Sequence, residues 1–163
     1  GFVSIIPDKL SVFNEELLLN KIFLVCNASW YDKLKNLHIK DLENVPIIFR
    51  EEGSGTRFKM ERFFETHHIK TNKRLELTSN EAVKQAVIAG LGISLMPLIG
   101  IKNEMLNGDL KIINLKELPL ITNWNLIWNS QKSLAPVAKA FLDYLKQNKS
   151  FIIDSRFSWF NEF

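Results

Sequence analysis

The residues of this sequence best suited to binding chemistry form one glycine-rich segment, REEGSGTR at positions 50–57. The segment follows an apolar run and precedes a helical pattern, so we expect it to connect a strand to a helix. Its two glycines allow a tight turn and a close approach of the backbone to a ligand. The hydroxyls of Ser54 and Thr56, the free N–H groups of a helix start and the guanidinium of Arg57 all suit an anion. The segment therefore predicts a carboxylate, sulfate or phosphate site, and the alternative is a plain helix start with a solvated arginine.

No catalytic motif accompanies this segment. A P-loop needs a lysine after the glycines and none follows, while Phe58 stands where a dinucleotide fingerprint needs its third glycine. Glu52 and Thr56 occupy the glycine positions of a nucleophile elbow around Ser54. Cys26 lies in an apolar run without a neighbouring histidine, which favours a buried structural thiol over a nucleophile. We therefore expect no enzyme activity and no cofactor.

Composition and charge exclude further classes of protein. With 46% hydrophobic residues, 24% charged residues and twelve phenylalanines, the 163-residue chain has ample apolar surface to bury, which excludes disorder. The net charge of +3 is too weak an excess to predict nucleic-acid binding by these residues themselves. A single cysteine excludes an internal disulfide and a cysteine-rich zinc site, so we expect no metal. The longest apolar stretch, 86–101, is shorter than the roughly 20 residues of a membrane span.

The hydrophobic patterns predict strands that alternate with helices. The pattern of a strand occurs at 21–26, 45–50, 75–77, 92–97 and 124–128. The pattern of a helix occurs at 54–66, from a cap among residues 78–80 to Gly90, and at 133–145 with Ser133 as its cap. Because the strands are apolar throughout, we expect an α/β fold with helices on both faces of a largely parallel sheet.

Four segments, taken in order, carry a resemblance to a known family. They read FVSIIP at 2–7, REEGSGTR at 50–57, SNEAVKQAV at 79–87 and AGLGISLMP at 89–97. In this order they resemble the effector-binding domain of LysR-type transcriptional regulators, and the resemblance continues to about residue 148. The glycine segment looks most like that of the subgroup linked to sulfur and carbon assimilation.

The resemblance implies a two-lobed fold like that of type II periplasmic binding proteins, with Rossmann-like lobes joined by two crossing strands. Residues 22–126 would form the second lobe, and residues 1–21 with 127–163 would belong to the first. The family's first lobe begins earlier, so we expect that lobe to be incomplete in this chain. The DNA-binding winged helix-turn-helix of the family is likewise expected to lie outside it. The aromatic tail, 151–163, extends past the family's usual end and has no functional explanation at this level.

The same resemblance implies a function in effector sensing. A small anionic metabolite would bind between the two lobes and control transcription through DNA that the N-terminal domain contacts. The family further implies a cytoplasmic homodimer or homotetramer without membrane association. The alternative with the same fold is a periplasmic-type solute-binding protein of a transporter. Carried over by position, the effector-binding residues would be Ser4 after the first-lobe strand and Ser54, Gly55, Thr56 and Arg57 in the second-lobe loop.

Overall fold

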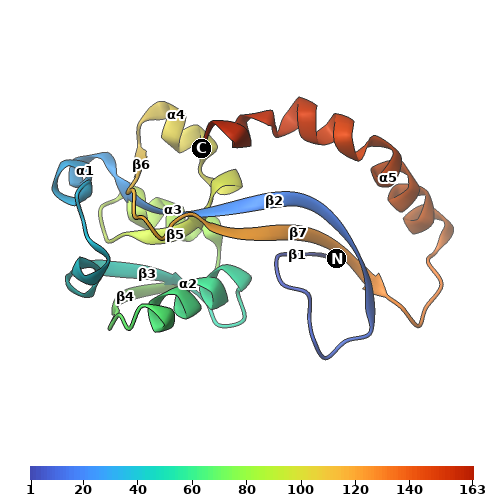
Figure 1. Ribbon diagram of the computed structural model, residues 1–163, viewed down its shortest axis with the longest axis horizontal. Coiled ribbons are helices and arrows are strands. Elements are labelled where there is room, and N and C mark those ends of the chain that lie inside the picture. The colour runs from blue at the N-terminus through green and yellow to red at the C-terminus, as the bar shows by residue number, and fades with distance from the viewer. The chain divides into compact units, whose positions relative to one another are not determined.

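The computed structural model describes all 163 residues, and the chain divides into two compact units (Figure 1). Unit 1 comprises residues 1–19 and 123–163, and unit 2 comprises residues 20–122. Two strands, β2 (Val12–Asn27) and β7 (Leu120–Asn129), each have residues in both units, as expected for the crossing strands.

The remaining strands are shorter than these two. The strands are β1 (Phe2–Val3), β3 (Pro46–Arg50), β4 (Asn72–Leu77), β5 (Ser94–Pro97) and β6 (Leu110–Ile112). The helices are α1 (Ala28–Leu34), α2 (Gly55–Thr66), α3 (Asn80–Ile88), α4 (Lys102–Asn107) and α5 (Pro136–Arg156). Short 3-10 helices cover Ile39–Asn44, Leu98–Gly100 and Ser158–Glu162. The order β3, α2, β4, α3, β5 confirms the alternation that the hydrophobic pattern predicts.

The pairing of the strands is mixed, so the expectation of a largely parallel sheet is wrong. β3 pairs in parallel with β4 and is joined to the β5 region by the parallel bridge between Ile47 and Ile93. β2 instead runs antiparallel to both β5 and β6, and β1 runs antiparallel to β7. Strands linked by a crossover helix are parallel, whereas β2 reaches unit 2 as a crossing strand and is free of that constraint. β4 pairs with β3 alone and is therefore an edge strand of the sheet.

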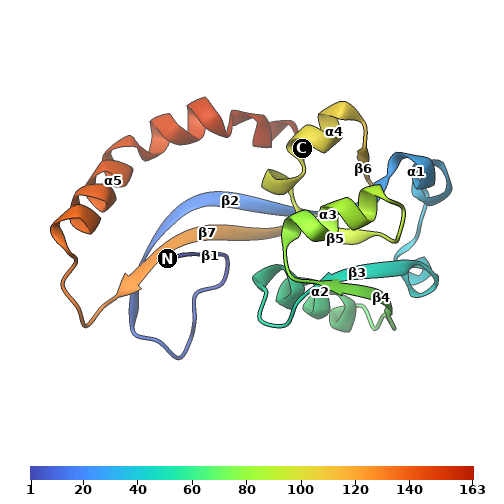
Figure 2. The same ribbon diagram turned by 180° about the vertical axis from the view of Figure 1, so that it is seen from behind.

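Two helices of unit 2 begin at the same edge of the sheet. Because β3 and β4 are parallel, their carboxyl ends meet at one edge, and α2 and α3 begin there (Figures 1 and 2). β2 is antiparallel to β5, which is parallel to β3. The helix α1 follows β2 directly and therefore begins at the opposite edge. Ligands of open α/β sheets bind beyond the carboxyl ends of the parallel strands. A ligand site is therefore expected at the edge where α2 and α3 begin.

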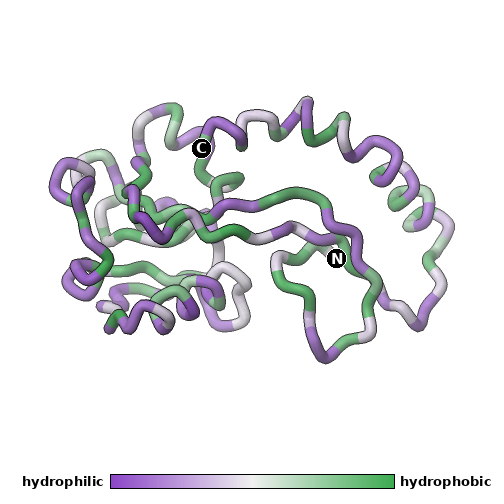
Figure 3. The backbone as a smooth tube through the Cα atoms, in the orientation of Figure 1, coloured by the Kyte–Doolittle hydropathy of each residue, from purple (hydrophilic) through white to green (hydrophobic).

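The main core of unit 2 packs α2 against the sheet. Ile47 and Phe49 of β3 lie in one buried cluster with Met60, Phe63 and Phe64 of α2. The rings of Phe49 and Phe64 have centroids 6.0 Å apart, and those of Phe63 and Phe64 are 5.6 Å apart. The apolar stripe expected on this helix is thus confirmed, and the hydrophobic colour along β3 and β5 in Figure 3 marks the strands it covers. This packing fixes the orientation of α2, and with it the start of the helix.

The ends of α3 follow the local sequence signals. Ser79 is the cap among its three candidates, since its hydroxyl accepts a hydrogen bond from the amide of Ala82 at 3.0 Å. At the other end Gly90 has a positive φ of 75°, which glycine adopts without strain. The amides of Gly90 and Leu91 donate back to carbonyls of the last helical turn at 2.9 and 3.0 Å, which is a Schellman motif.

The last helix, in unit 1, begins and ends later than predicted. Its cap is Ala135 and not Ser133, because Pro136 excludes the helical conformation at the residue before it. α5 then continues to Arg156 and so includes the first part of the aromatic tail, with Leu142 as its buried residue. Figure 3 shows hydrophilic and hydrophobic colours alternating along it. The rest of the tail forms a small aromatic cluster in which Trp159 and Phe160 have ring centroids 4.4 Å apart.

Candidate functional site

The glycine segment forms the turn from β3 into α2. The hydroxyl of Ser54 accepts a hydrogen bond from the amide of Arg57 at 3.4 Å, so Ser54 is the N-cap of the helix. Gly53 has a φ of 86° and permits the turn, which the amide of Ser54 closes by donating to the carbonyl of Glu51 at 3.2 Å. The predicted helix start is therefore confirmed, and it lies at the edge of unit 2 to which ligands of such sheets bind.

The start of α2 offers backbone donors to an anion. Gly55 and Thr56 are the first residues of the helix, and amides at this position have no acceptor within the helix. The dipole of the 12-residue helix adds partial positive charge at the same point. The hydroxyl of Thr56 is a further donor. Such an arrangement can bind a carboxylate, sulfate or phosphate group without a free cation.

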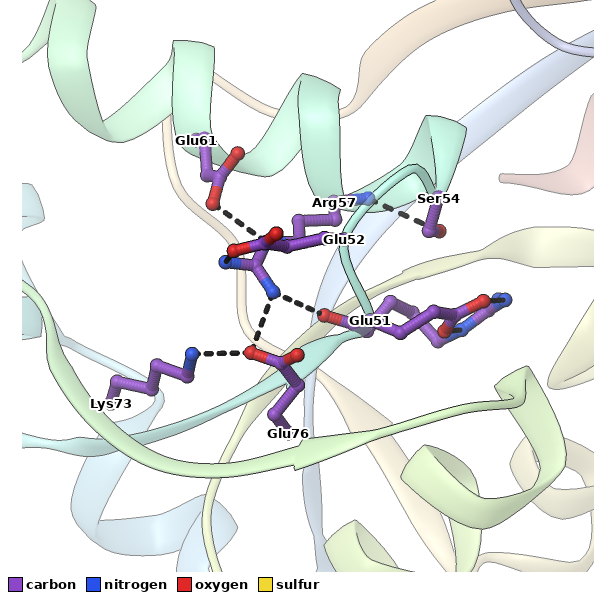
Figure 4. A network of polar contacts seen from close by, with 8 residues as sticks. Glu51, Glu52, Ser54, Arg57, Glu61, Lys73 and Glu76 are labelled. Carbon is purple, nitrogen blue, oxygen red and sulfur yellow. Dashed lines mark hydrogen bonds and ion pairs between the residues drawn. The ribbon is translucent and has the colours of Figure 1, made fainter.

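Arg57 is buried in a network of ion pairs (Figure 4). Only 9% of the residue is exposed. Its Nε donates to Glu61 at 2.7 Å, and its Nη1 donates to Glu76 at 2.6 Å and to the carbonyl oxygen of Arg50 at 3.1 Å. Its Nη2 lies 3.7 Å from a carboxylate oxygen of Glu52. The structure therefore directs the guanidinium toward protein carboxylates on three sides.

The charges in this network stabilise one another. The hydrogen bond to Glu61, followed by the one to Glu76, raises the pKa of Arg57 above its ordinary value despite the burial of the group. Hydrogen bonds from Lys73 and then Arg57 lower the pKa of Glu76. Arg57 and Glu76 are accordingly charged at neutral pH, and Arg57 and Lys73 each already have a protein carboxylate as a partner.

A second arginine connects the two helix starts. Arg50, the last residue of β3, donates from Nε and Nη2 to the carboxylate of Glu51 at 2.7 and 2.8 Å. Its Nη1 donates to the side-chain oxygen of Asn80, the first residue of α3. The hydrogen bond from Arg50 also lowers the pKa of Glu51. The end of β3 is thus tied both to its own loop and to the neighbouring helix.

The residues expected to bind an effector fall into different parts of the structure. Ser54, Gly55, Thr56 and Arg57 lie together at the start of α2, all in unit 2. Ser4 follows β1 and belongs to unit 1. The partners of Arg57 were missed by the sequence reasoning. The four-residue spacing to Glu61 on one helix was a usable signal, but Glu76 reaches Arg57 only because β4 pairs with β3.

No group of three or more His, Cys, Asp or Glu side chains is arranged to hold a metal ion. No helix combines the length and the apolar character that crossing a bilayer requires.

The single cysteine is shielded within β2. Cys26 is fully buried, and burial raises the pKa of its thiol to about 11. The ordinary pKa of a cysteine thiol is 9.0, so at pH 8 the folded chain holds roughly a hundredfold less thiolate than an unfolded one. We therefore expect iodoacetamide to label Cys26 slowly in buffer and fast in denaturant, as measured by intact mass. Rapid labelling of the folded protein would contradict this burial.

The comparison with known protein families decides the classification. The family described as LysR substrate binding domain matches residues 1–150. The chain belongs to this family. It is 39% identical over 140 residues to the HTH-type transcriptional activator CmpR of Synechocystis sp., covering 85% of this chain and 46% of that protein. It is 36% identical over 140 residues to the RuBisCO operon transcriptional regulator of Acidithiobacillus ferrooxidans, with coverages of 85% and 45%. The chain spans about half the length of the curated relatives it matches.

Solved structures of regulatory domains share the fold of this LysR-family chain. The CcmR regulatory domain of Synechocystis PCC6803, solved in complex with 2-PG, matches with a TM-score of 0.82 and 30% identity over 91% of this chain and 72% of that one. The effector binding domain of QuiR in complex with shikimate matches with a TM-score of 0.78 over 91% of this chain and 70% of that one. At 19% identity, QuiR supports the fold alone. The expected type II periplasmic-binding-protein-like fold is thereby confirmed.

These comparisons also decide between the classes of protein left open by the sequence. The curated relatives are named as transcriptional regulators and not as enzymes, as the lack of a catalytic motif predicts. The resemblance to the LysR family is confirmed. Nothing in the comparisons supports the alternative of a solute-binding protein that serves a transporter.

Proposed function

We propose that this chain is the effector-sensing part of a LysR-type transcriptional regulator and that its effector is a small anion. The observation that carries the proposal is the 39% identity over 140 residues to the transcriptional activator CmpR. The structural neighbour CcmR, solved in complex with 2-PG, supports a binding role for the same domain. The donors at the start of α2 support an anion as the ligand.

The binding site that we propose is built on α2. The amides of Gly55 and Thr56 and the hydroxyl of Thr56 would hold an oxyanion, and Ser54 would keep the helix start in place as its cap. Ser4, in unit 1, remains in the proposal as a further effector contact, because the resemblance to the family implies a polar contact after the first-lobe strand. Binding can shift the regulator between two conformations only if the effector has a higher affinity for one of them.

The remaining partners belong to the whole regulator. The curated relatives are about twice as long as this chain and several are named HTH-type regulators. We propose that the complete protein binds DNA through an N-terminal winged helix-turn-helix, acts as a homodimer or homotetramer, and works in the cytoplasm.

The test is a titration of the protein with candidate anions, followed by a change at the start of α2. Isothermal titration calorimetry with 2-PG, shikimate, inorganic phosphate and sulfate is expected to give a measurable Kd for at least one. Thr56→Ala should weaken that Kd by about tenfold, the effect of losing one hydrogen bond to a charged group. Ser54→Ala should also weaken it, because the helix start that presents the donors loses its cap.

The matched control is Asn27→Ala. Asn27 caps α1 by accepting a hydrogen bond from the amide of Trp30 at 3.1 Å, at the opposite edge of the sheet from α2. Removing either cap should destabilise the fold by about 1 kcal/mol, but only Ser54→Ala should also weaken binding. An unchanged Kd in Thr56→Ala and Ser54→Ala would place the site elsewhere, and no binding of any anion would reject the anionic effector.

A further inference from the structure

The donors of Arg57 are already engaged by the protein itself. Nε and Nη1 donate to Glu61, to Glu76 and to the carbonyl of Arg50, and Nη2 is within ion-pair distance of Glu52. An arginine that binds a ligand needs a free pair of N–H groups to form its bidentate contact. The geometry leaves only Nη2 for such a contact, and Glu52 lies beside it. Arg57 is therefore poorly placed to be the direct partner of an anion.

The charges around Arg57 also argue against direct contact between this residue and an anion. Arg57 and Lys73 face the carboxylates of Glu52, Glu61 and Glu76. Counted as formal charges, the cluster carries one negative charge more than it carries positive charge. An incoming anion would gain little attraction from a cation whose field is cancelled at such short range. The affinity for an anion must then come from the backbone and hydroxyl donors of the helix start.

The contacts of Arg57 instead span the glycine segment. One contact is to the carbonyl of Arg50, at the last position of β3, and another is to Glu52 within the turn. The backbone amide of Arg57 donates to Ser54 at the end of the turn. Glu61 on α2 and Glu76 on β4 hold the guanidinium from two further elements. The side chain thus reaches from the first turn of α2 back to the last residue of β3 and is anchored in both the helix and the sheet.

We propose that Arg57 is a positioning residue: it fixes the turn at residues 51–56 in the shape that presents the Gly55 and Thr56 donors, and it does not itself contact the effector. This inference rests on the proposed function for its consequence in binding, while its structural part concerns the turn alone. Glu76 acts with Arg57 in the same role, although it lies on the strand β4 and Arg57 lies on the helix α2. The side chain of Arg57 thereby determines affinity indirectly.

The decisive test is the sign of the effect of Glu76→Gln on effector affinity. If Arg57 contacted the anion, Glu76→Gln would remove a competing carboxylate and tighten binding. In the positioning role, losing the Glu76 carboxylate loosens the turn and weakens binding. We expect the Kd for 2-PG, measured by titration calorimetry, to rise by about tenfold in Glu76→Gln and in Arg57→Gln, with little further loss in the double variant. Tighter binding by Glu76→Gln would overturn the inference.

A second measurement needs no ligand and separates this inference from the proposed function. The amides of Ser54, Arg57 and Phe58 are hydrogen-bonded across the turn, and their hydrogen exchange can be followed by NMR. Arg57→Gln should speed their exchange about tenfold or more relative to wild type, because local opening becomes easier. The amide of Val83, bonded to Ser79 at the start of α3, should keep its rate as the internal control.

Arg74→Gln is the matched control variant. Arg74 is an exposed arginine on the same strand as Glu76, so its replacement removes a charge without touching the turn. It should change neither the exchange rates nor the Kd by more than about twofold. Unchanged exchange in Arg57→Gln would reject the positioning role. Faster exchange in a protein that binds no anion would keep that role and reject the proposed function.

Discussion

Replacing Phe64 by alanine is expected to lower the free energy of unfolding by about 3–5 kcal/mol. Phe64 is 3% exposed and packs against the rings of Phe49 and Phe63 where α2 meets the sheet. The cavity left by the missing ring would cost both apolar burial and dispersion contacts. Urea unfolding followed by circular dichroism measures the change. The milder Phe64→Leu should show a smaller loss if alanine prevents folding.

The control for this change lies on the same helix. Phe58 is 45% exposed, and its ring is contacted by the guanidinium of Arg62 at 5.7 Å. Phe58→Ala should therefore cost less than about 1 kcal/mol. Equal losses from Phe58→Ala and Phe64→Ala would mean that α2 does not pack through the face described above.

Gly92→Ala should also be strongly destabilising, for a different reason. A methyl group on Gly92 would lie 2.5 Å from the carbonyl oxygen of Pro46, a backbone atom that cannot move aside independently. The same carbonyl accepts the hydrogen bond from Ile93 that joins the β5 region to β3, at 2.9 Å. Relieving the clash would separate these segments, at a cost of about 1–3 kcal/mol or more. Each kcal/mol should lower the Tm by roughly 2–4 °C, which differential scanning calorimetry can measure.

Gly100→Ala provides the comparison for Gly92→Ala. A Cβ at Gly100 would meet no atom within 4 Å. This second substitution should change stability by no more than about 0.5 kcal/mol. A Gly92→Ala protein as stable as Gly100→Ala would be incompatible with the close approach of the backbone at Pro46.

The parts of the fold that local signals control were predictable from the sequence. The turn at Gly53, the cap at Ser54 and the helix that follows depend on residues within a few positions of one another, and the structure has all three. The same holds for the Schellman motif at Gly90. At Ser133 the signal of a capping residue is overridden by Pro136, because a proline restricts the residue before it more strongly than a capping residue favours a helix start. The proline that shifts the helix start is thus itself a local signal in the sequence.

The parts that depend on distant partners were not predictable. The apolar run at 21–26 indicates a buried strand but carries no information on direction, and β2 proved antiparallel. The full length of β2 was also missed, because its first residues are largely exposed and lack the pattern of a buried strand. The burial of Arg57 depends on Glu76, which is brought close by strand pairing. An arginine beside a glycine turn has the same sequence signature whether it binds a ligand or a neighbouring carboxylate.

The position of β4 at the edge of the sheet has a consequence for how the protein behaves at high concentration. An unpaired edge offers its N–H and C=O groups to a strand of another molecule, and charged side chains discourage that addition. β4 carries Lys73, Arg74 and Glu76, two of which also belong to the network around Arg57. The charged side chains of Lys73 and Glu76, which help to order the turn at residues 51–56, therefore also discourage β4 from pairing with a strand of another molecule. A sequence that neutralised all three would remain folded in dilute solution and self-associate by strand addition as it is concentrated.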